Sequence, residues 1–436
     1  MTRKWTLGAV SFAALLFLIL GQSAILRPQD ESPDAPDLSL VQANRQRGRF
    51  VQALYQLDVV ADQAGWSADR LQLAGDIWRD LGDLTRALPY WEAASLQQPD
   101  DRLLRRVLAE AYLTMQRWPD AVDQLTGLIQ ADANDAWAHF QVGMLRAAFD
   151  PQAAEVDLQA AVNVPDYHDL AAALHRIVTE QNTDPLIGMP VGLALADAGY
   201  WPQAELAFRH AADVAQAYPE ALAYVGLARE QQGKDGSDWI KRAVALGPRS
   251  AAVRYVQGLH LRSRNDLDGS LKALLQAVVL DPVNPAYYAE LGTAYKLVGD
   301  LDNAERWLRV GVETSNQDPR FQRLLALFYA EEVPNLESGL SDLQVLATVM
   351  PDDPDVQAGV AWGVYQSGDP DAALAALDAI LQADPAHPRS LFYKARILLE
   401  AGNLDGAEPL LEQLVGLDSP FQADSQRLLD GLEAAR

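Results

Sequence analysis

The sequence predicts an all-α protein in which helix-turn-helix repeats stack into a superhelical solenoid, preceded by one N-terminal transmembrane helix. Three observations support this prediction. Small residues recur at intervals near 34 residues, a long uncharged run follows the first few residues, and no alternating strand pattern is evident. A fixed period of this length is typical of arrays built from paired helices.

The first element is the uncharged run of residues 5–26, which follows Arg3 and Lys4. Its 22 residues are enough to cross a bilayer of about 30 Å as a helix. Bases precede the run and acids predominate after it, so residues 1–4 are expected in the cytoplasm and the rest of the chain outside it. The alternative is a signal peptide cleaved near Gly21 and Ser23, which would give a secreted protein.

Residues 27–37, RPQDESPDAPD, form the next segment. They combine three prolines with five charged residues and lack a large apolar side chain. This composition predicts an extended spacer rich in proline and aspartate.

The remainder of the chain is periodic in its small residues. Successive intervals are 34, 34, 49, 34, 32, 34, 34, 35 and 34 residues. The positions are Gly75, Ala109, Gly143, Gly192, Gly226, Gly258, Gly292, Ala326, Ala361 and Ala395.

A second small residue follows twelve positions later in most of these segments, and a large apolar residue four positions after that. Gly292, Ala304 and Leu308 illustrate the pattern. Small residues allow two helices to approach closely, and the large residue fills the space between them. Turn signals such as Gly299-Asp300 separate the two helices.

These positions, together with Leu291, Tyr295 and Pro282, give the chain a pattern that resembles the tetratricopeptide repeat family. The resemblance implies ten units that begin near residues 68, 102, 136, 185, 219, 251, 285, 319, 354 and 388. A weaker unit covers 34–67. The implied organisation is an N-terminal subarray at 38–165, an irregular inserted helix at 166–184, a C-terminal subarray at 185–420 and a capping helix at 421–436.

Two departures from the period stand out. The interval of 49 residues contains the insertion at 166–184, which could be a hinge, a docking helix or an incomplete repeat. The unit at 219 is two residues short, with GKDGSDWIKRA in place of the usual turn, and we assign this change no chemical role. His168 and His175 in the insertion lack further ligands nearby, so we expect surface or packing roles for them.

Composition and motifs limit the possible functions. The net charge of -25 would repel a phosphate backbone, so we expect no nucleic-acid partner. The absence of cysteine excludes disulfides, thiolate metal sites and cysteine nucleophiles. No phosphate-binding loop, dinucleotide fingerprint, zinc-protease motif or serine elbow is present. We therefore expect no catalytic residue, no cofactor and no metal.

The resemblance also implies which side chains bind a partner. In the family, the first helix of each unit lines a concave groove, with side chains at places 2, 5, 9 and 12 of the unit reaching the ligand. Aromatic, apolar and basic residues at these places would hold an extended peptide through apolar pockets and carboxylate pairing. The candidates are Arg79, Arg106, Trp137, Phe140, Met144, Met189, Tyr255, Leu259, Arg262, Lys296, Arg320, Arg323, Trp362, Tyr365, Arg389, Phe392 and Arg396. The competing interpretation is that the superhelix buries these aromatics against its own repeats.

The sequence thus predicts a protein-interaction scaffold in a single-pass membrane protein, with the repeats on the outer side of a bacterial cell membrane. Its partner would be a protein or peptide, within an envelope assembly. The alternatives are a regulatory or assembly subunit that recruits substrate to a separate enzyme, and an enzyme in its own right, such as a glycan-processing one. No pattern specifies an oligomeric state.

Overall fold

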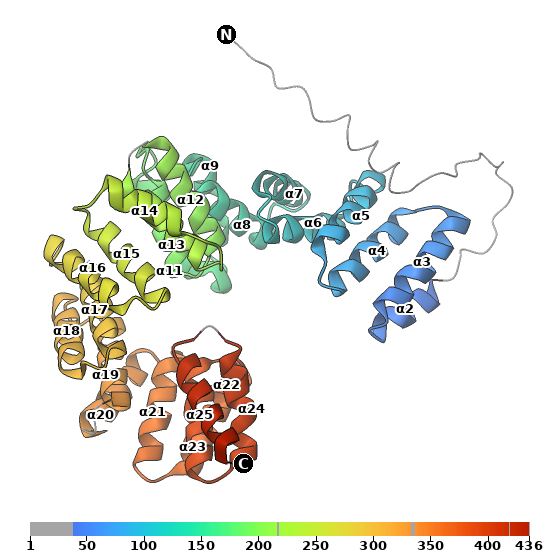
Figure 1. Cartoon of the computed structure of the whole chain (residues 1–436). Helices are drawn as coiled ribbons and strands as arrows, with labels where there is room; N and C mark the ends of the chain where they lie inside the picture. Colours follow the sequence, from blue (N-terminus) through green and yellow to red (C-terminus); the bar gives the residue numbers. More distant parts are fainter. Residues whose placement is uncertain (1–37, 216–217, 333–335, 418, 436) are drawn as a thin grey trace. The chain divides into compact units, whose positions relative to one another are not determined.

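The described part of the chain is helical throughout. The computed structural model describes residues 38–215, 218–332, 336–417 and 419–435. Over these residues it contains the helices α2 to α25 and one short 3-10 helix, with no strand (Figure 1). The predicted all-α repeat fold is confirmed for these residues.

The expected cytoplasmic N-terminus (1–4), transmembrane helix (5–26) and spacer (27–37) all lie outside the described residues. In the part that is described, no helix combines the length and the apolar character needed to cross a membrane. Membrane anchoring therefore stays a prediction from the sequence.

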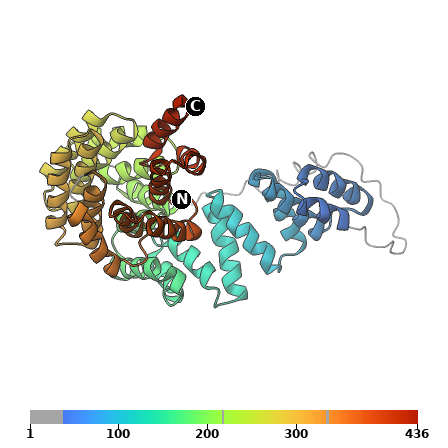
Figure 2. The same ribbon diagram turned by 90° about the horizontal axis from the view of Figure 1, so that it is seen from below.

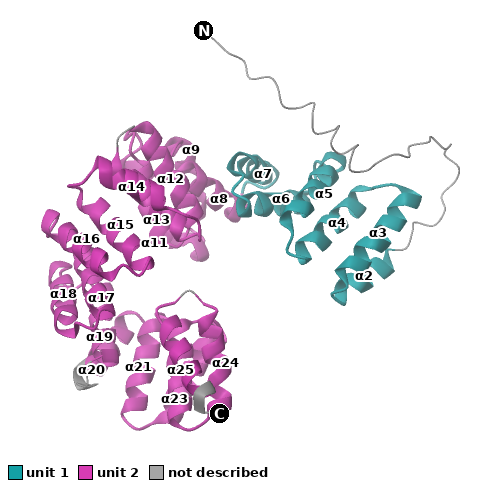
Figure 3. Ribbon diagram, viewed as in Figure 1, with its two compact units in different colours: residues 1–133 teal, residues 134–436 magenta. Residues whose placement is uncertain are grey.

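The chain divides into two compact units, residues 1–133 and residues 134–436 (Figure 3). The predicted insertion at 166–184 lies within the second unit. Unit 1 contains three helix pairs: α2 (Ser39–Gln46) with α3 (Phe50–Ala64), α4 (Ala68–Asp80) with α5 (Leu84–Gln97), and α6 (Arg102–Thr114) with α7 (Trp118–Ala131).

Unit 2 begins with the pair α8 and α9 and ends with the single helix α25. Within this unit, consecutive helices pack against each other in chain order (Figure 2). Its helices are α8 (Ala136–Arg146), α9 (Pro151–Ala161), η1 (Pro165–Tyr167), α10 (His168–Glu180), α11 (Gly188–Asp197), α12 (Trp201–Val214), α13 (Pro219–Glu230), α14 (Ser237–Leu246), α15 (Ala251–Ser263), α16 (Leu267–Leu280), α17 (Pro285–Leu297), α18 (Leu301–Thr314), α19 (Pro319–Glu332), α20 (Leu336–Val349), α21 (Pro354–Gln366), α22 (Pro370–Ala383), α23 (Pro388–Glu400), α24 (Leu404–Val415) and α25 (Gln422–Ala435).

In the ten units listed above, the first helix begins at the residue that the period indicates, with one exception. Helix α11 begins at Gly188 instead of residue 185, because residues 185–187 form a turn. The side chain of Asp184 accepts a hydrogen bond from the backbone N–H of Leu186 within this turn. The start of the helix is thereby delayed by three residues.

The pairing of small and large residues is a steric requirement of the helix pairs. A Cβ atom added to Gly75 would lie 2.5 Å from Nε1 of Trp91, which is itself buried. A Cβ atom on Gly292 would lie 2.8 Å from Cγ of Leu308. Both separations are well inside van der Waals contact, so these sites accept only glycine without rearrangement.

The glycine and the aspartate of a Gly-Asp turn have separate roles. Gly299 has a φ of 80°, in the left-handed region that glycine adopts without steric cost. Asp300 then accepts a hydrogen bond from the backbone N–H of Asn303 and so caps α18. The dipeptide ends one helix and begins the next.

The insertion forms an integral part of the core of unit 2. Helix α10 buries Ala171, Leu174 and Val178 completely and packs against α9 and α11. The preceding 3-10 helix places Tyr167 in a stack with Phe140 of α8, with ring centroids 4.5 Å apart. The extra segment therefore acts as an unpaired helix that continues the packing between two helix pairs.

Candidate functional site

In several units, the side chain at place 12 contacts a side chain of the next unit, one position after its place 12. The two partners are 35 residues apart in sequence. Arg45 Nε lies 2.6 Å from Asp80 Oδ2, and Lys296 Nζ lies 2.7 Å from Glu331 Oε2. The Tyr365 hydroxyl donates a hydrogen bond to Glu400 in the same way. These contacts join the C-terminal ends of successive first helices.

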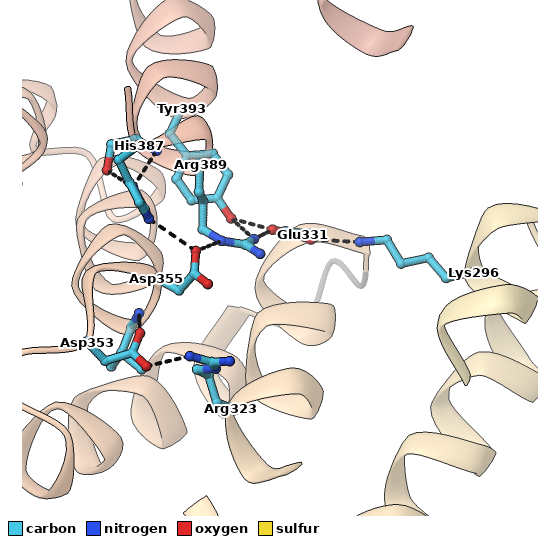
Figure 4. A network of polar contacts seen from close by, with 10 residues as sticks. Lys296, Arg323, Glu331, Asp353, Asp355, His387, Arg389 and Tyr393 are labelled. Carbon is cyan, nitrogen blue, oxygen red and sulfur yellow. Dashed lines mark hydrogen bonds and ion pairs between the residues drawn. The ribbon is translucent and has the colours of Figure 1, made fainter. Parts of the chain in front are cut away.

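Glu331, near the end of α19, is the centre of a larger network (Figure 4). Its Oε2 accepts a hydrogen bond from Lys296 of α17, and its Oε1 accepts one of 2.6 Å from the Tyr393 hydroxyl of α23. Arg389 of α23 pairs with the same carboxylate. The Glu331 side chain is only 12% exposed, so this acid links helices of three repeats in a place with little solvent.

Acids at the start of α21 also pair with Arg389 and with one further cation, Arg323. Arg389 Nε lies 2.9 Å from Asp355 Oδ1, and Arg323 Nη1 lies 2.5 Å from Asp353 Oδ2. Burial raises the pKa of Tyr393 to about 12, although the neighbouring Arg389 opposes this shift. The predicted partner-binding cations Lys296, Arg323 and Arg389 are thus paired with acids of the array itself.

Ser390, His387 and Asp355 superficially resemble a nucleophile, base and carboxylate. The Ser390 hydroxyl lies 2.8 Å from His387 Nδ1, and His387 Nε2 lies 3.5 Å from Asp355. However, Ser390 is completely buried, and His387 Nδ1 also accepts the backbone N–H of Ser390 as the cap of α23. A nucleophile without access to substrate cannot attack it, so this arrangement serves as a helix cap.

A second group of predicted residues meets between α21 and α23. The guanidinium of Arg396 lies 4.5 Å from the ring centroid of Trp362 and 5.9 Å from that of Phe392. Both rings are buried, and Tyr365 lies against Trp362 at 5.3 Å. The Arg396 side chain is 38% exposed, so a partner can reach part of it, and its Nη2 lies 3.9 Å from Glu400 Oε1.

The remaining candidates in unit 2 near its start are mainly core residues. Phe140, Met144 and Met189 belong to one buried cluster, and Trp137 is half-buried.

Arg320 of α19 is 65% exposed and pairs with Asp318 at 2.8 Å. Partner binding by these residues stays a prediction.

The two candidates of unit 1 lie beside acids of their own helices. Arg79 Nη2 is 3.4 Å from Asp76, and its guanidinium lies 5.5 Å from the ring centroid of Trp91. Arg106 Nε is 3.2 Å from Glu110. Both side chains remain about two-fifths exposed.

A hollow of about 350 Å³ lies between the C-terminal ends of α13 and α15. It brings together the predicted residues Leu259 and Arg262, at places 9 and 12 of one unit, with Leu227 and Glu230 at the same places of the preceding unit. The full lining is Leu227, Glu230, Gln231, Lys234, Leu259, Arg262, Ser263 and Arg264. Tyr255 lies on α15 and packs against Tyr287, and burial raises its pKa.

Lys234 and Arg264 are lining residues that the sequence pattern did not identify. Lys234 belongs to the connection between α13 and α14, residues 231–236, which is longer than the three-residue connection between α15 and α16. Helix α14 is ten residues long instead of the fourteen seen in α16 and α18. The two-residue deficit of this unit thus lies in the length of its helices.

Among the residues that the structure describes, no group of three or more histidine, aspartate or glutamate side chains is arranged to hold a metal ion. His168, in the insertion, contacts a backbone oxygen: its Nδ1 lies 2.7 Å from the carbonyl of Val162. This contact ties the exposed His168 to the end of α9.

Three segments of the chain match known repeat families. Residues 73–136 and residues 364–429 each match a model described as tetratricopeptide repeat, and residues 258–299 match one described as TPR repeat. The matched segments lie in both compact units.

Similar proteins include a curated relative and several solved structures. The chain is 23% identical to cellulose synthase operon protein C of Pseudomonas fluorescens (strain SBW25), over 93% of this chain and 33% of the relative. It therefore spans about a third of that relative's length. Yeast Tom70 is 14% identical with a TM-score of 0.39, over 91% of this chain and 94% of Tom70. The APC/C hetero-tetramer Cut9-Hcn1 is 12% identical with a TM-score of 0.48, over 90% of this chain and 95% of the other. A tetratricopeptide repeat protein from Parabacteroides merdae is 14% identical with a TM-score of 0.44, over 56% of this chain and 96% of that one.

Proposed function

Because this chain carries tetratricopeptide repeats, we propose that it is a membrane-anchored scaffold that presents the first helices of its repeats to a protein or peptide partner. The observation that supports this proposal most directly is the partly exposed Arg396 side chain, whose guanidinium lies against the Trp362 and Phe392 rings. An arginine held against aromatic rings offers charge pairing from a fixed position, and arginine is enriched at protein interfaces.

Affinity capture tests whether the chain binds a partner as a scaffold. The tagged full chain is cross-linked in membranes of its native host, and the captured proteins are compared between the wild type and Arg396→Glu. We expect the variant to recover a specific partner several-fold less well, because the reversed charge repels the group that the arginine bound. The exposed Lys272 of α16, a second helix, provides the matched control Lys272→Glu, which should capture normally.

Two results would contradict the scaffold. One is the absence of any partner that depends on Arg396. The other is enzymatic turnover by the purified chain alone, which would favour the enzyme alternative. Circular dichroism of both variants establishes that they fold.

The second candidate function is a regulatory or assembly subunit of a polysaccharide-producing system. The name of the curated relative, a cellulose synthase operon protein, favours this candidate. In that case the partner recovered by capture would be a synthase or an export component. A partner unrelated to polysaccharide synthesis would leave the general scaffold as the better description.

Anchoring by residues 5–26 is part of the proposal. Its support is the run of 22 uncharged residues with bases on its N-terminal side. Mass spectrometry of the mature N-terminus distinguishes the two possibilities. A chain that retains residues 5–26 and resists alkaline extraction from membranes is anchored, whereas a chain that begins near residue 24 or 25 is secreted.

A further inference from the structure

We propose that one corner of the first helix pair binds the surface of an anionic membrane. The corner consists of Arg47 and Arg49, in the connection between α2 and α3, and of Val51 and Tyr55 in the first half of α3. The inference rests on the anchoring by residues 5–26 that is proposed above. It adds a second membrane contact, made by the folded repeats themselves.

Helix α3 exposes a stripe of large apolar side chains. Val51, Tyr55 and Val59 recur every four residues, so they lie along one face of the helix, and they are 69%, 70% and 40% exposed. In the other two helix pairs of compact unit 1, the equivalent places lie 34 and 68 positions further along the chain. They hold no large aliphatic or aromatic residue: Thr85, Pro89 and Ala93 in α5, and Pro119, Asp123 and Gly127 in α7. The stripe is therefore a feature of the first helix pair and not of the repeat, and such exposed apolar faces mark sites of interaction.

The start of the stripe is basic, although the chain as a whole has a net charge of -25. Residues 38–57 contain three arginines and no acid. Arg45 pairs with Asp80 of α4, whereas Arg47 and Arg49 are exposed, and no acid of the described residues pairs with either. Guanidinium groups match the geometry of phosphate, so these two arginines are suited to anionic lipid headgroups.

Two acids limit the contact to the first half of α3. Asp58 and Asp62 follow Val51 and Tyr55 by seven residues each, so they lie on the same face of the helix but nearer its C-terminal end. Both are exposed. An anionic surface attracts the arginines and repels these acids, so α3 approaches the membrane tilted, with its N-terminal end nearer to the headgroups.

The position of the corner in the chain favours a lipid surface as its partner. Residues 27–37 separate the proposed anchor from the first helix pair, and eleven residues span at most about 40 Å even when fully extended. The anchor therefore keeps the corner close to the bilayer at all times, so weak contacts are enough to hold it there.

The chemistry of the corner agrees with this position. Tyrosine is enriched at the interface between membrane and water, and arginine places its charged end among headgroups while its stem covers apolar surface. Apolar side chains beside basic ones are typical of helices that lie on anionic membranes.

The test measures how close α3 lies to lipid. The chain has no cysteine, so Gln52→Cys, at an exposed place beside Val51, accepts a single fluorescent label. The full labelled chain is reconstituted into vesicles of equimolar phosphatidylglycerol and phosphatidylcholine that contain a nitroxide-labelled lipid, which quenches nearby fluorophores. We expect the label at Gln52→Cys to be quenched several-fold more strongly than one at Thr114→Cys, at the exposed end of α6. Vesicles of phosphatidylcholine alone should quench the Gln52→Cys label less.

Further substitutions in the Gln52→Cys chain identify the groups responsible. Arg47→Glu together with Arg49→Glu should reduce the quenching several-fold, because the reversed charges are repelled by phosphatidylglycerol. Tyr55→Ser should also reduce it, because the apolar contact is lost. Arg86→Glu is the matched control: this arginine of α5 is 64% exposed, so its reversal should leave the quenching unchanged. Far-UV circular dichroism checks that every variant retains its helices.

Three results would overturn the inference. The first is equal quenching at Gln52→Cys with and without phosphatidylglycerol, which would mean that the arginines bind something other than lipid, such as the acids of residues 27–37. The second is equal quenching before and after reversal of Arg47 and Arg49. The third is a disulfide-linked dimer of the Gln52→Cys chain in the vesicles, which would show that a second copy covers the stripe.

Failure of this inference is distinguishable from failure of the proposed anchor. A chain that stays with the vesicles during alkaline extraction but shows no quenching at Gln52→Cys would reject the second membrane contact and leave the anchored scaffold standing. A chain that alkaline extraction removes from the vesicles would reject the anchor and this inference together.

Discussion

Single cations on the first helices differ in how they are held. Lys296, Arg323 and Arg389 face acids of neighbouring repeats, and Glu331 alone contacts two of them. Arg320 and Arg396 keep larger exposed fractions. Removing one member of a poorly solvated ion pair leaves the other charge without compensation, which is the costly step. Lys296, Arg323 and Arg389 therefore stabilise the array. Arg320 and Arg396 are better placed for contact with a partner.

Glu331→Gln tests this division. The amide retains the shape of the side chain but leaves Lys296 and Arg389 without their shared charge. We expect a loss of about 1–3 kcal/mol in local stability, measured as faster amide hydrogen exchange in α17, α19 and α23.

Glu332→Gln is the matched control for that substitution. Glu332 also contacts Lys296, at 3.1 Å, but its side chain is 32% exposed. A partly solvated pair is worth less than about 1 kcal/mol, so exchange should change little. Equal effects of the two variants would contradict a special role for Glu331.

At the level of elements, α10 departs most from the regular pairing. It follows α9 without a partner helix of its own, yet Ala171, Leu174 and Val178 on its apolar face are completely buried. Amphipathic spacing predicted that a helix would form here, and packing determined that it belongs to the core of unit 2. A hinge would require fewer buried contacts.

Leu174→Ala measures how strongly α10 supports its neighbours. Leu174 is completely buried, so the cavity left by the substitution should cost about 2–5 kcal/mol. Amide exchange should quicken in α9, α10 and α11. The exposed Arg176 of the same helix gives the control Arg176→Ala, which should leave exchange unchanged. An unaffected α9 in Leu174→Ala would favour the hinge or docking-helix interpretation.

Across the whole molecule, buried tyrosines link stability to alkaline pH. Burial raises the pKa of Tyr112, Tyr224 and Tyr255, and it raises those of Tyr329 and Tyr393 to about 12. An unfolded tyrosine loses its proton near pH 10 while the folded one retains it, so the unfolded state gains stability as the pH rises above 10. The array should therefore lose stability progressively between pH 10 and pH 12.

The thermal midpoint measured from pH 9 to pH 12 checks this expectation. Tyr393 alone should account for a loss of about 2–3 kcal/mol by pH 12. Tyr393→Phe should lower the midpoint at pH 9, since the bond to Glu331 is lost, but it should make the decline above pH 10 shallower. The exposed Tyr55 supplies the control Tyr55→Phe. If the thermal midpoint of the wild type and of both variants fell equally steeply above pH 10, Tyr393 would not be a source of this loss of stability.

Much of the fold was accessible from the sequence because each repeat contacts mainly its neighbours. Gly75 with Trp91 and Gly292 with Leu308 pack as the spacing indicated. The site was less accessible. The resemblance placed Leu259 and Arg262 on one face, but it could not indicate that Lys234 lies beside them, because its position depends on how residues 231–236 fold between α13 and α14.

The sequence by itself determined the all-helical repeat architecture of the described residues and the residues at which most first helices begin, since both follow from local steric rules repeated every 34 residues or so. Only the tertiary structure decided which acids pair with the cations of the first helices. Glu331 reaches Arg389 and Tyr393, 58 and 62 positions away, because the repeats bring α19 and α23 together. Such pairings depend on the geometry of stacked helices, and no local pattern in the sequence specifies them.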